Sequence, residues 1–514
     1  MKLAMALLAG VLVAHGHVGS PDVFFEGLAG PYRLLVTIRP PEVVPGVAEV
    51  EIRSTSPAVS QIHIVPLRMT GVASSLAPVP DLARPSKEDP QFYTGSLWLM
   101  STGLWKVRVE ADGTAGRGTL FVPVPAIATR VLGMQKAVAA AVLPLGLILV
   151  FGLVSIAGAA VREALLDPGK APGNAQRRRA RIVMAVAAII VAGVVWFGNA
   201  WWSSEDGAHR RRVYKPLGLT STVESDRLHL KLTDPGWLDR DTDSLLPDHG
   251  HLMHLFIVRL PQMQRVLHLH PDRTGPGTFT QILPAMEAGR YALYGDVVHQ
   301  GGFAETATGE IGLPNIHGAP LANDDSEGTG EPLEHADYHR MSAPAGGGLR
   351  MVWDRGAEAF HARRPYSFRF RLEDAAGQRV RDVELYMGML GHAAFVSHDG
   401  SVFAHVHPFG SVAMPALELA QPKPQTGQAE PADSRPSPMQ PQNLQPGRAR
   451  EGNPHDSHTQ PDNPHAAHMA ADTALPSEVS FPYGFSKPGA YRIIVQMKRA
   501  GQVVTGIFDV QVEN

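Results

Sequence analysis

Two long uncharged stretches constrain the fold of this chain more than any other feature of its sequence. Ala137 to Val161 and Ile182 to Ser204 contain no charged residue. Each stretch is long enough to cross ~30 Å of hydrocarbon as a helix. The sequence therefore predicts a transmembrane hairpin with spans at residues 137–161 and 182–204.

The charges around these spans predict an orientation. The connecting segment, residues 162–181, is basic, and basic loops face the cytoplasm. Residues 1–16 place a lysine before an apolar run and are typical of a signal peptide. We therefore predict a protein of the inner (cytoplasmic) membrane whose N- and C-terminal domains lie in the periplasm or outside the cell.

The length of the chain indicates several domains. At 514 residues it exceeds what one hydrophobic core normally holds. Composition predicts a linker rich in Gly, Pro and acidic residues, and a disordered insertion rich in Pro, Gln, Asn and His inside the last domain. The predicted segments are domain one at 17–125, domain two at 214–313, the linker at 314–347 and domain three at 348–514, with the insertion at 419–476.

A recurring pattern near the end of each predicted domain indicates the fold class. A glycine close to an aromatic residue is followed by alternating apolar residues, then a turn and a second alternating run, starting near Thr102, Ala288 and Pro488. Each pattern predicts a β-hairpin. We therefore predict a mainly β protein with three small antiparallel β-sandwich domains, immunoglobulin-like or cupredoxin-like in outline, besides the transmembrane hairpin.

Composition narrows the possible chemistry. A net charge of -3 gives no field that would attract nucleic acid, so we expect no nucleic-acid partner. Cysteine is absent, which removes thiol nucleophiles, disulfides and thiolate metal sites. The chain has 23 His and 17 Met, and the histidines are concentrated in the C-terminal half. If the protein binds metal, its ligands must be His, Met or carboxylate.

Domains two and three share a histidine pattern. The stretch from Asp248 aligns with the stretch from Tyr386, and each contains one His followed by a His-x-His pair that ends at a proline. On a strand, residues two apart share a face, so both imidazoles of a pair point the same way. The matched histidines are His254 with His392, His268 with His405, and His270 with His407.

An upstream difference between the two copies favours copper. On the strand predicted upstream of the shared His, His249 and His251 stand opposite Met387 and Met389. Thioether sulfur prefers Cu(I) and imidazole binds Cu(II), so an exchange of one for the other favours copper. Zinc remains possible as a metal bound by the imidazoles. In the alternative interpretation, the histidines are solvated residues on a sheet face and the methionines fill a core. We predict one site in each domain. The predicted metal ligands are His249, His251, His254, His268 and His270 in domain two, and Met387, Met389, His392, His405 and His407 in domain three.

Domain three resembles FixH/YtkA-like and CopC-like periplasmic copper-binding β-sandwich domains. The resemblance rests on the final hairpin and on Met-x-Met-x-x-His at Met387, Met389 and His392, and it is looser over the other domains. It implies copper delivery, storage or resistance, with His405 and His407 as further ligands. It also suggests other copper-handling or oxidase-assembly proteins as partners.

Two other functions compete with copper binding. A cupin-like metal-dependent enzyme also begins its site with His-x-His, but that pattern next requires a Glu that neither copy supplies. A metal-free receptor would use its sandwiches to bind a partner. No catalytic motif is present, so we predict no catalytic residues and do not favour an enzyme.

Overall fold

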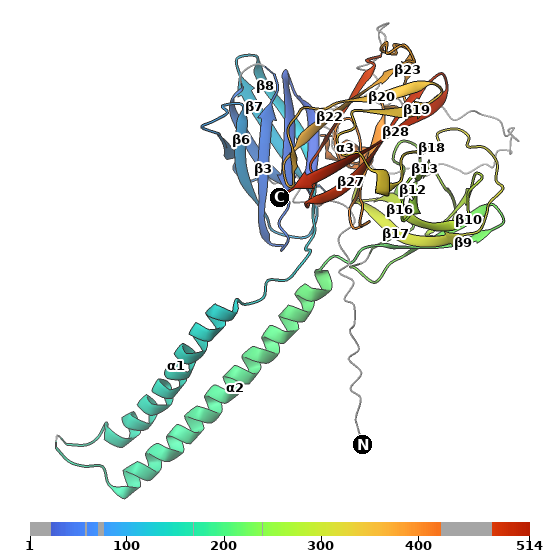
Figure 1. Ribbon diagram of the computed structural model, residues 1–514. Helices are drawn as coiled ribbons and strands as arrows, with labels where there is room; N and C mark the ends of the chain where they lie inside the picture. Colours follow the sequence, from blue (N-terminus) through green and yellow to red (C-terminus); the bar gives the residue numbers. More distant parts are fainter. Residues whose placement is uncertain (1–21, 57–58, 70–76, 168, 239, 423–474) are drawn as a thin grey trace, which may run out of the picture.

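The computed structural model describes residues 22–56, 59–69, 77–167, 169–238, 240–422 and 475–514. The protein is mainly β, with several sheets and two long apolar helices. In Figure 1 the strands form a head, and α1 (Lys136–Glu163) and α2 (Asn174–Arg212) leave it together as an arm. The predicted signal peptide and nearly all of the predicted insertion lie outside the described residues.

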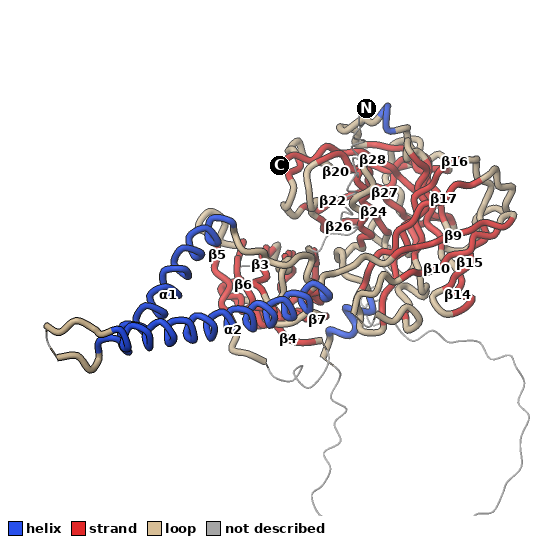
Figure 2. Tube along the Cα trace, turned by 90° about the horizontal axis from the view of Figure 1, so that it is seen from below, coloured by secondary structure: helices blue, strands red, loops and turns tan. Residues whose placement is uncertain are grey.

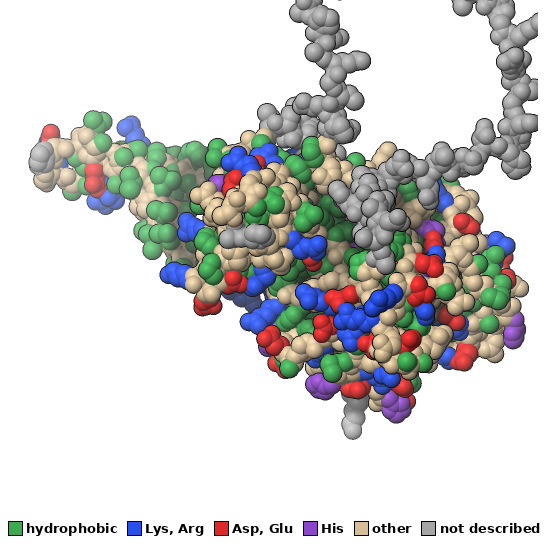
Figure 3. Space-filling view, turned by 90° about the horizontal axis from the view of Figure 1, so that it is seen from above, with side chains coloured by type: hydrophobic (Ala, Val, Ile, Leu, Met, Phe, Trp, Pro, Cys, Tyr) green, Lys and Arg blue, Asp and Glu red, His purple; other side chains and the backbone are tan. Residues whose placement is uncertain are grey.

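Both helices of the arm are long and apolar enough to cross a bilayer. Their most hydrophobic windows are 0% and 6% buried, and the far ends of both helices extend beyond the strands (Figure 2). Hydrophobic side chains follow the arm, whereas charged side chains gather on the head (Figure 3). The backbone N–H of Tyr214 donates to the carbonyl of Ala128 over 2.7 Å, so the two ends of the arm meet at the head.

The loop of the arm is shorter than predicted. The segment 162–181 was expected to be a loop, but α2 begins at Asn174 and takes in the basic run that ends at Arg181. Alanine, arginine and glutamine favour helix, and no glycine or proline interrupts this run. The helix therefore extends beyond the uncharged span.

The N-terminal sheet has eight strands in the order β1-β2-β3-β6-β5-β4-β7-β8. Apolar residues from all of these strands form one hydrophobic cluster. The predicted hairpin near Thr102 is confirmed as β7 paired with β8. The strands are β1 (Val23–Ala29), β2 (Tyr32–Arg39), β3 (Gly46–Ser54), β4 (Val59–Arg68), β5 (Asp81–Pro85), β6 (Phe92–Leu99), β7 (Gly103–Gly113) and β8 (Gly116–Ala126).

The middle β region, residues 218–329, is one ten-stranded sheet in the order β14-β15-β10-β9-β17-β16-β12-β13-β18, with β11 beside β16. The hairpin predicted near Ala288 is confirmed as β16 with β17. Its strands are β9 (Gly218–Glu224), β10 (Arg227–Thr233), β11 (Leu245–Leu246), β12 (His254–Leu260), β13 (Arg265–Leu269), β14 (Asp272–Gly275), β15 (Thr278–Ile282), β16 (Gly289–His299), β17 (Ala304–Leu313) and β18 (Ser326–Thr329).

The segment predicted as a linker, residues 314–347, contains regular structure. Strand β18 pairs with β13, and a single 3-10 turn, η2 (Leu333–His335), follows it. The small residues of this segment allow close packing: a Cβ on Gly328 would lie 2.4 Å from Thr505. Gly328 therefore fits tightly against Thr505, in a segment that is ordered rather than a simple linker.

The C-terminal β region, residues 342–513, has two sheets that share one hydrophobic cluster. The hairpin predicted near Pro488 is confirmed as β27 with β28. The four-stranded sheet has β19 (Ser342–Gly346), β20 (Leu349–Asp354), β22 (Tyr366–Glu373) and β26 (Glu478–Tyr483), and the six-stranded sheet has β21 (Phe360–His361), β23 (Val383–Glu384), β24 (His392–Ser397), β25 (Phe403–Val406), β27 (Gly489–Arg499) and β28 (Gln502–Glu513).

The middle and C-terminal regions pack face to face. Apolar side chains of β12, β13 and β16 form one buried cluster with those of β24, β25, β27 and β28. At its centre the rings of Tyr294 and Phe403 stack with centroids 4.6 Å apart. Arg492 is fully buried beside Asp509 and donates to the carbonyl of Met263 in the other region. This interface brings the two histidine motifs together.

The N-terminal sheet supports the loop that follows β25. The backbone N–H of Glu26 donates to the carbonyl of Phe409 over 2.7 Å, and the N–H of Ser411 donates to the carbonyl of Phe24 over 2.9 Å. Helix α3 (Met414–Ala420) packs into the hydrophobic cluster of this sheet. The loop between β25 and α3 is therefore held in place by strand β1.

Candidate metal centre

A short turn holds the first predicted ligands in both regions. φ is +51° at His249 and +49° at Met387, and it is also positive at the glycines that follow, Gly250 and Gly388. We expected a strand here, but the structure has a turn, because glycine readily adopts positive φ. Each turn is closed by a bridge, Asp248 with His251 and Tyr386 with Met389. The aligned residues thus share one backbone conformation.

The next histidines form the same contact in both regions. His254 begins β12 and lies on the same face as His268 of the neighbouring β13, while His392 begins β24 beside His405 of β25. Nδ1 of His254 is 3.1 Å from Nε2 of His268. Nδ1 of His392 is also 3.1 Å from Nε2 of His405. The two copies therefore repeat side-chain geometry as well as sequence.

All eight predicted histidines meet in one cluster. Two sites were expected, one in each domain, but the face-to-face packing merges them. Ring centroids across the interface are 5.2 Å apart for His254 and His405, and 4.8 Å apart for His249 and His407. The eight residues are His249, His251, His254, His268, His270, His392, His405 and His407.

Three groups within the cluster could hold a metal ion. In each group the ligand atoms lie within 4.8 Å of one another, and two of the groups take ligands from both regions. Neighbouring nitrogens on a tetrahedral ion are roughly 3.3 Å apart, given metal–nitrogen bonds of about 2.0 Å. The two 3.1 Å contacts are close to this spacing. The groups are His254, His268, His405; His392, His405, His407; and Asp248, His249, His407.

Several imidazole nitrogens in the cluster are buried without a hydrogen-bond partner among the described residues. They are the Nε2 atoms of His249, His270, His392 and His407. A buried polar atom without a partner costs about 1–3 kcal/mol, so such atoms are uncommon in folded proteins. A metal ligand needs a nitrogen that is free of hydrogen bonds, and the described part of the chain places four such nitrogens in this cluster.

Burial keeps these imidazoles neutral. It lowers the pKa of His249 to about 3, and neighbouring imidazoles add to the shift. Burial likewise holds the pKa values of His254, His268, His270, His392 and His407 well below the usual range. Burial also raises the pKa of Asp248 to about 7. Neutral imidazole is the form that binds metal, so the cluster is prepared for it at neutral pH.

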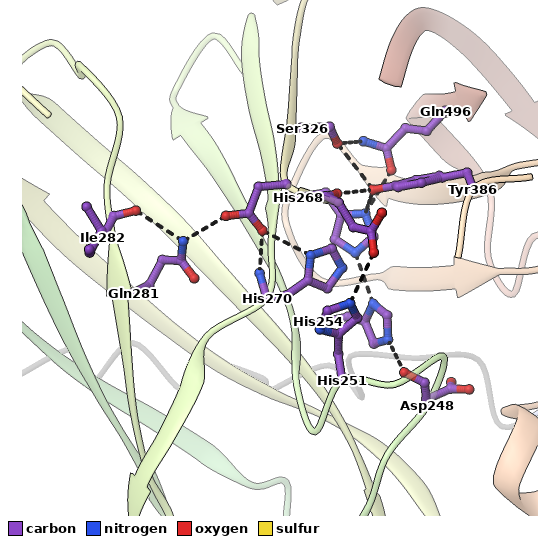
Figure 4. A network of polar contacts seen from close by, with 12 residues as sticks. Asp248, His251, His254, His268, His270, Gln281, Ile282, Ser326, Tyr386 and Gln496 are labelled. Atoms are coloured by element: carbon purple, nitrogen blue, oxygen red, sulfur yellow. Dashed lines mark hydrogen bonds and ion pairs between the residues drawn. The ribbon is translucent and has the colours of Figure 1, made fainter. Parts of the chain in front are cut away.

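Polar residues around the cluster orient its imidazoles. In two cases a residue of one region contacts a histidine of the other region. Asp296 of the middle region lies 3.3 Å from Nδ1 of His405. Gln496 of the C-terminal region lies 2.9 Å from Nδ1 of His268, and Tyr386 approaches the same atom (Figure 4). Because Nδ1 of His268 and of His405 contacts a residue outside the cluster, Nε2 of each ring faces into the cluster, as in metal-bound histidines.

The same orientation holds at the ends of both His-x-His pairs. Nδ1 of His270 lies 3.0 Å from Asp325, and Nδ1 of His407 lies 3.2 Å from the carbonyl of Val412. Val412 belongs to the loop held by the N-terminal sheet. The N-terminal sheet therefore helps to orient His407, although the sheet itself supplies no predicted ligand.

The predicted methionines lie toward the edge of the cluster. Met389 packs against the hydrophobic cluster of the N-terminal sheet, as does Phe409. Met387 is partly buried, and its backbone contacts the ring of His249. His251 is partly exposed and stacks on His270, with centroids 4.0 Å apart. The buried centre is therefore made of nitrogen ligands.

Sequence reasoning did not identify the outer partners. Asp296 pairs in register with His254, and Gln496 pairs in register with His392. Both lie seven residues after the glycine of the aligned hairpins, Gly289 and Gly489. Alignment of the hairpins would have matched these two positions. It would not have shown that each one serves the histidine of the opposite region.

A cavity of about 190 Å³ adjoins the cluster. It lies where the N-terminal sheet meets the other two regions, and Leu104, Pro123 and Ile127 line one side. Tyr214, which follows the arm, also lines it. The histidines that reach the cavity are His251, His254, His405 and His407.

Comparison with known proteins identifies no function. A family model for a domain of unknown function (DUF8832) matches residues 217–311 and 345–429, which contain the two histidine motifs. No curated protein matches the chain. A tetra-tandem repeat from the extending region of a large adhesion protein is 8% identical with a TM-score of 0.16, covering 91% of this chain and 71% of that one. Salmonella alpha-2-macroglobulin reacted with methylamine is 10% identical with a TM-score of 0.19, covering 96% of this chain and 24% of that one. Likeness at this level carries no inference about fold or function.

Proposed function

We propose that this chain is a membrane-anchored, extracytoplasmic copper-binding protein that serves copper storage, delivery or resistance. One observation carries the proposal: eight imidazoles from two separate parts of the sequence meet in a single, largely buried cluster. A solvated sheet face would not bury them or leave four nitrogens without partners. Deep burial favours retention of the ion, so storage fits better than rapid delivery.

Copper is the metal we propose first. The buried donors are imidazole nitrogens, which suit Cu(II), zinc and nickel. Among divalent ions, Cu(II) has the highest affinity for such sites. The exchange of His249 and His251 for methionines in the second copy adds support from the sequence. Zinc is the alternative that metal analysis must separate from copper.

The finer fold and location belong to the same proposal. Each of the three β parts has a hydrophobic cluster of its own, which supports three β-sandwich domains of immunoglobulin-like or cupredoxin-like outline. We propose that the C-terminal region is related to the FixH/YtkA-like and CopC-like domains. The arm would anchor the head to the inner membrane on its periplasmic side, where copper-handling or oxidase-assembly proteins could be partners.

Metal analysis of the full-length protein in detergent tests this proposal. We expect purified wild-type protein to retain copper against a competing chelator. We expect the double variant His405→Ala, His407→Ala to lose most of it, because each of the three ligand groups contains at least one of these two rings. The matched control is His335→Ala, an exposed histidine outside the cluster. Equal copper in both variants, or zinc alone in the wild type, would refute copper binding at this cluster.

A metal-dependent enzyme is the second candidate, because the cavity reaches four of the histidines. A small molecule in the cavity could approach a bound ion. Addition of azide to the Cu(II)-loaded protein discriminates the two functions. A changed Cu(II) absorption spectrum would indicate an open coordination position and favour an enzyme, and an unchanged spectrum would favour storage.

A further inference from the structure

The cluster contains two sets of three imidazoles with no member in common. Set one is His254, His268 and His405, whose ring centroids are 5.2–5.5 Å apart. Set two is His249, His392 and His407, whose centroids are 4.8–5.1 Å apart. Three imidazoles on one tetrahedral ion would have centroids roughly 5 Å apart, given metal–nitrogen bonds of about 2.0 Å. The ring spacing of each set is therefore that of a three-histidine site, and in set one the ligand atoms also lie within 4.8 Å of one another.

Hydrogen bonding distinguishes the two sets. In set one, Nδ1 of His254 faces Nε2 of His268, and outer partners hold the Nδ1 atoms of His268 and His405. In set two, all three Nε2 atoms are buried without a partner among the described residues. An ion bound only by set one would leave those three nitrogens unsatisfied. One metal ion thus does not account for the cluster.

His392 lies between the two sets. Its Nδ1 is 3.1 Å from Nε2 of His405 in set one. Its Nε2, on the other side of the ring, is one of the unpartnered atoms of set two. Nδ1 of His392 thus faces set one, and Nε2 of the same ring faces set two.

The remaining histidines do not form a third position of this kind. The rings of His251 and His270 stack with centroids 4.0 Å apart and an interplanar angle of 30°. Stacked rings direct their nitrogens side by side and do not converge on one point between them. His251 is also partly exposed, unlike the members of the two sets.

We propose that the cluster binds two metal ions as a close pair, one in each set, with His392 between them. This inference rests on the proposed metal-binding function. To bind both ions, the His392 ring must release its N–H proton to solvent and act as an imidazolate. The two ions would then lie roughly 6 Å apart, given bonds of about 2.0 Å to each nitrogen. Two Cu(II) ions that close should couple magnetically.

Copper stoichiometry together with electron paramagnetic resonance tests the pair. The full-length protein in detergent is loaded with Cu(II) and dialysed against a chelator that removes exposed copper. We expect two copper ions per chain in the wild type, with a resonance signal weaker than the copper content predicts. His268→Gln in set one and His249→Gln in set two should each retain one ion and show the full signal of an isolated Cu(II). His335→Gln is the matched control and should behave as the wild type does.

The outcomes separate this inference from the function beneath it. One ion per wild-type chain, lost in His268→Gln and kept in His249→Gln, would overturn the pair and leave copper binding intact. No retained copper would overturn both. Two ions with the full resonance signal would place them too far apart and also overturn the pair. Circular dichroism of each variant shows that it is folded, and a variant that fails is replaced by His254→Gln or His407→Gln of the same set.

Discussion

At the scale of single residues, the cluster depends on imidazoles that burial keeps uncharged. Six of them have pKa values lowered by burial. In the unfolded chain the same side chains take up protons below about pH 6.5. In the metal-free protein these buried rings therefore stay neutral at a pH at which the same side chains are protonated in the unfolded chain.

We predict that metal-free protein loses stability as the pH falls below about 6.5. The unfolded state binds protons first, so each lowered imidazole contributes a loss of up to about 1.4 kcal/mol per pH unit. Asp248, with its pKa raised to about 7, binds a proton in the folded state as the pH falls below about 7. This uptake offsets the contribution of one of the six imidazoles. Urea midpoints at pH 7.5, 6.5 and 5.5 measure the slope.

A matched pair of variants controls this measurement. His268→Gln removes one buried titrating group and should make the slope shallower. His335→Gln changes an exposed group and should leave the slope as it is. A midpoint that is constant between pH 7.5 and 5.5 would contradict neutral burial.

At the scale of elements, the loop between β25 and α3 joins the N-terminal sheet to the cluster. φ at Gly410 is +126°, and a Cβ there would lie 1.9 Å from the carbonyl oxygen of Phe24. Two residues further along, the carbonyl of Val412 accepts from the His407 ring. A glycine that fits against β1 thus positions a proposed ligand.

Gly410→Ala should therefore weaken both stability and copper retention. We expect a loss of about 2–3 kcal/mol, because the added methyl forces the loop off β1. Gly356→Ala is the control, since a Cβ there meets nothing within 4 Å and should change stability by less than about 0.5 kcal/mol. Urea midpoints and copper content of both variants test the expectation. Equal midpoints would show that the loop is not fixed by this contact.

At the scale of the whole molecule, the arm and head have different surfaces. The apolar helices are largely unburied, and both ends of the arm meet beside the cavity at Ala128 and Tyr214. If the arm crosses the membrane, the cavity side of the head faces the bilayer. In the orientation predicted from the charges, the loop at the other end of the arm would then lie in the cytoplasm.

The absence of cysteine allows a direct test of this topology. Lys170→Cys marks the loop of the arm, and Arg273→Cys marks the exposed surface of the head. We expect a membrane-impermeant maleimide to label Arg273→Cys in spheroplasts and to label Lys170→Cys only after the membrane is opened. The reverse pattern would place the head in the cytoplasm.

Local patterns in the sequence were sufficient for the two long helices and the three hairpins. Uncharged runs predicted the two helices, and alternation predicted the three hairpins. The alignment of the His motifs also predicted equivalent backbone positions in two regions. These features follow from helical and strand periodicity, which neighbouring residues decide.

Only the tertiary structure decided that the two histidine motifs form one cluster. The faces of β12 and β24 meet because Phe256, Tyr294 and Phe403 bury one another across the interface. The reciprocal contacts of Asp296 and Gln496 follow from that packing. Neither appears as a periodicity or a spacing, since the partners are more than a hundred residues apart. Burial of apolar surface between distant strands placed the histidines, and the sequence by itself determined which strands would carry them.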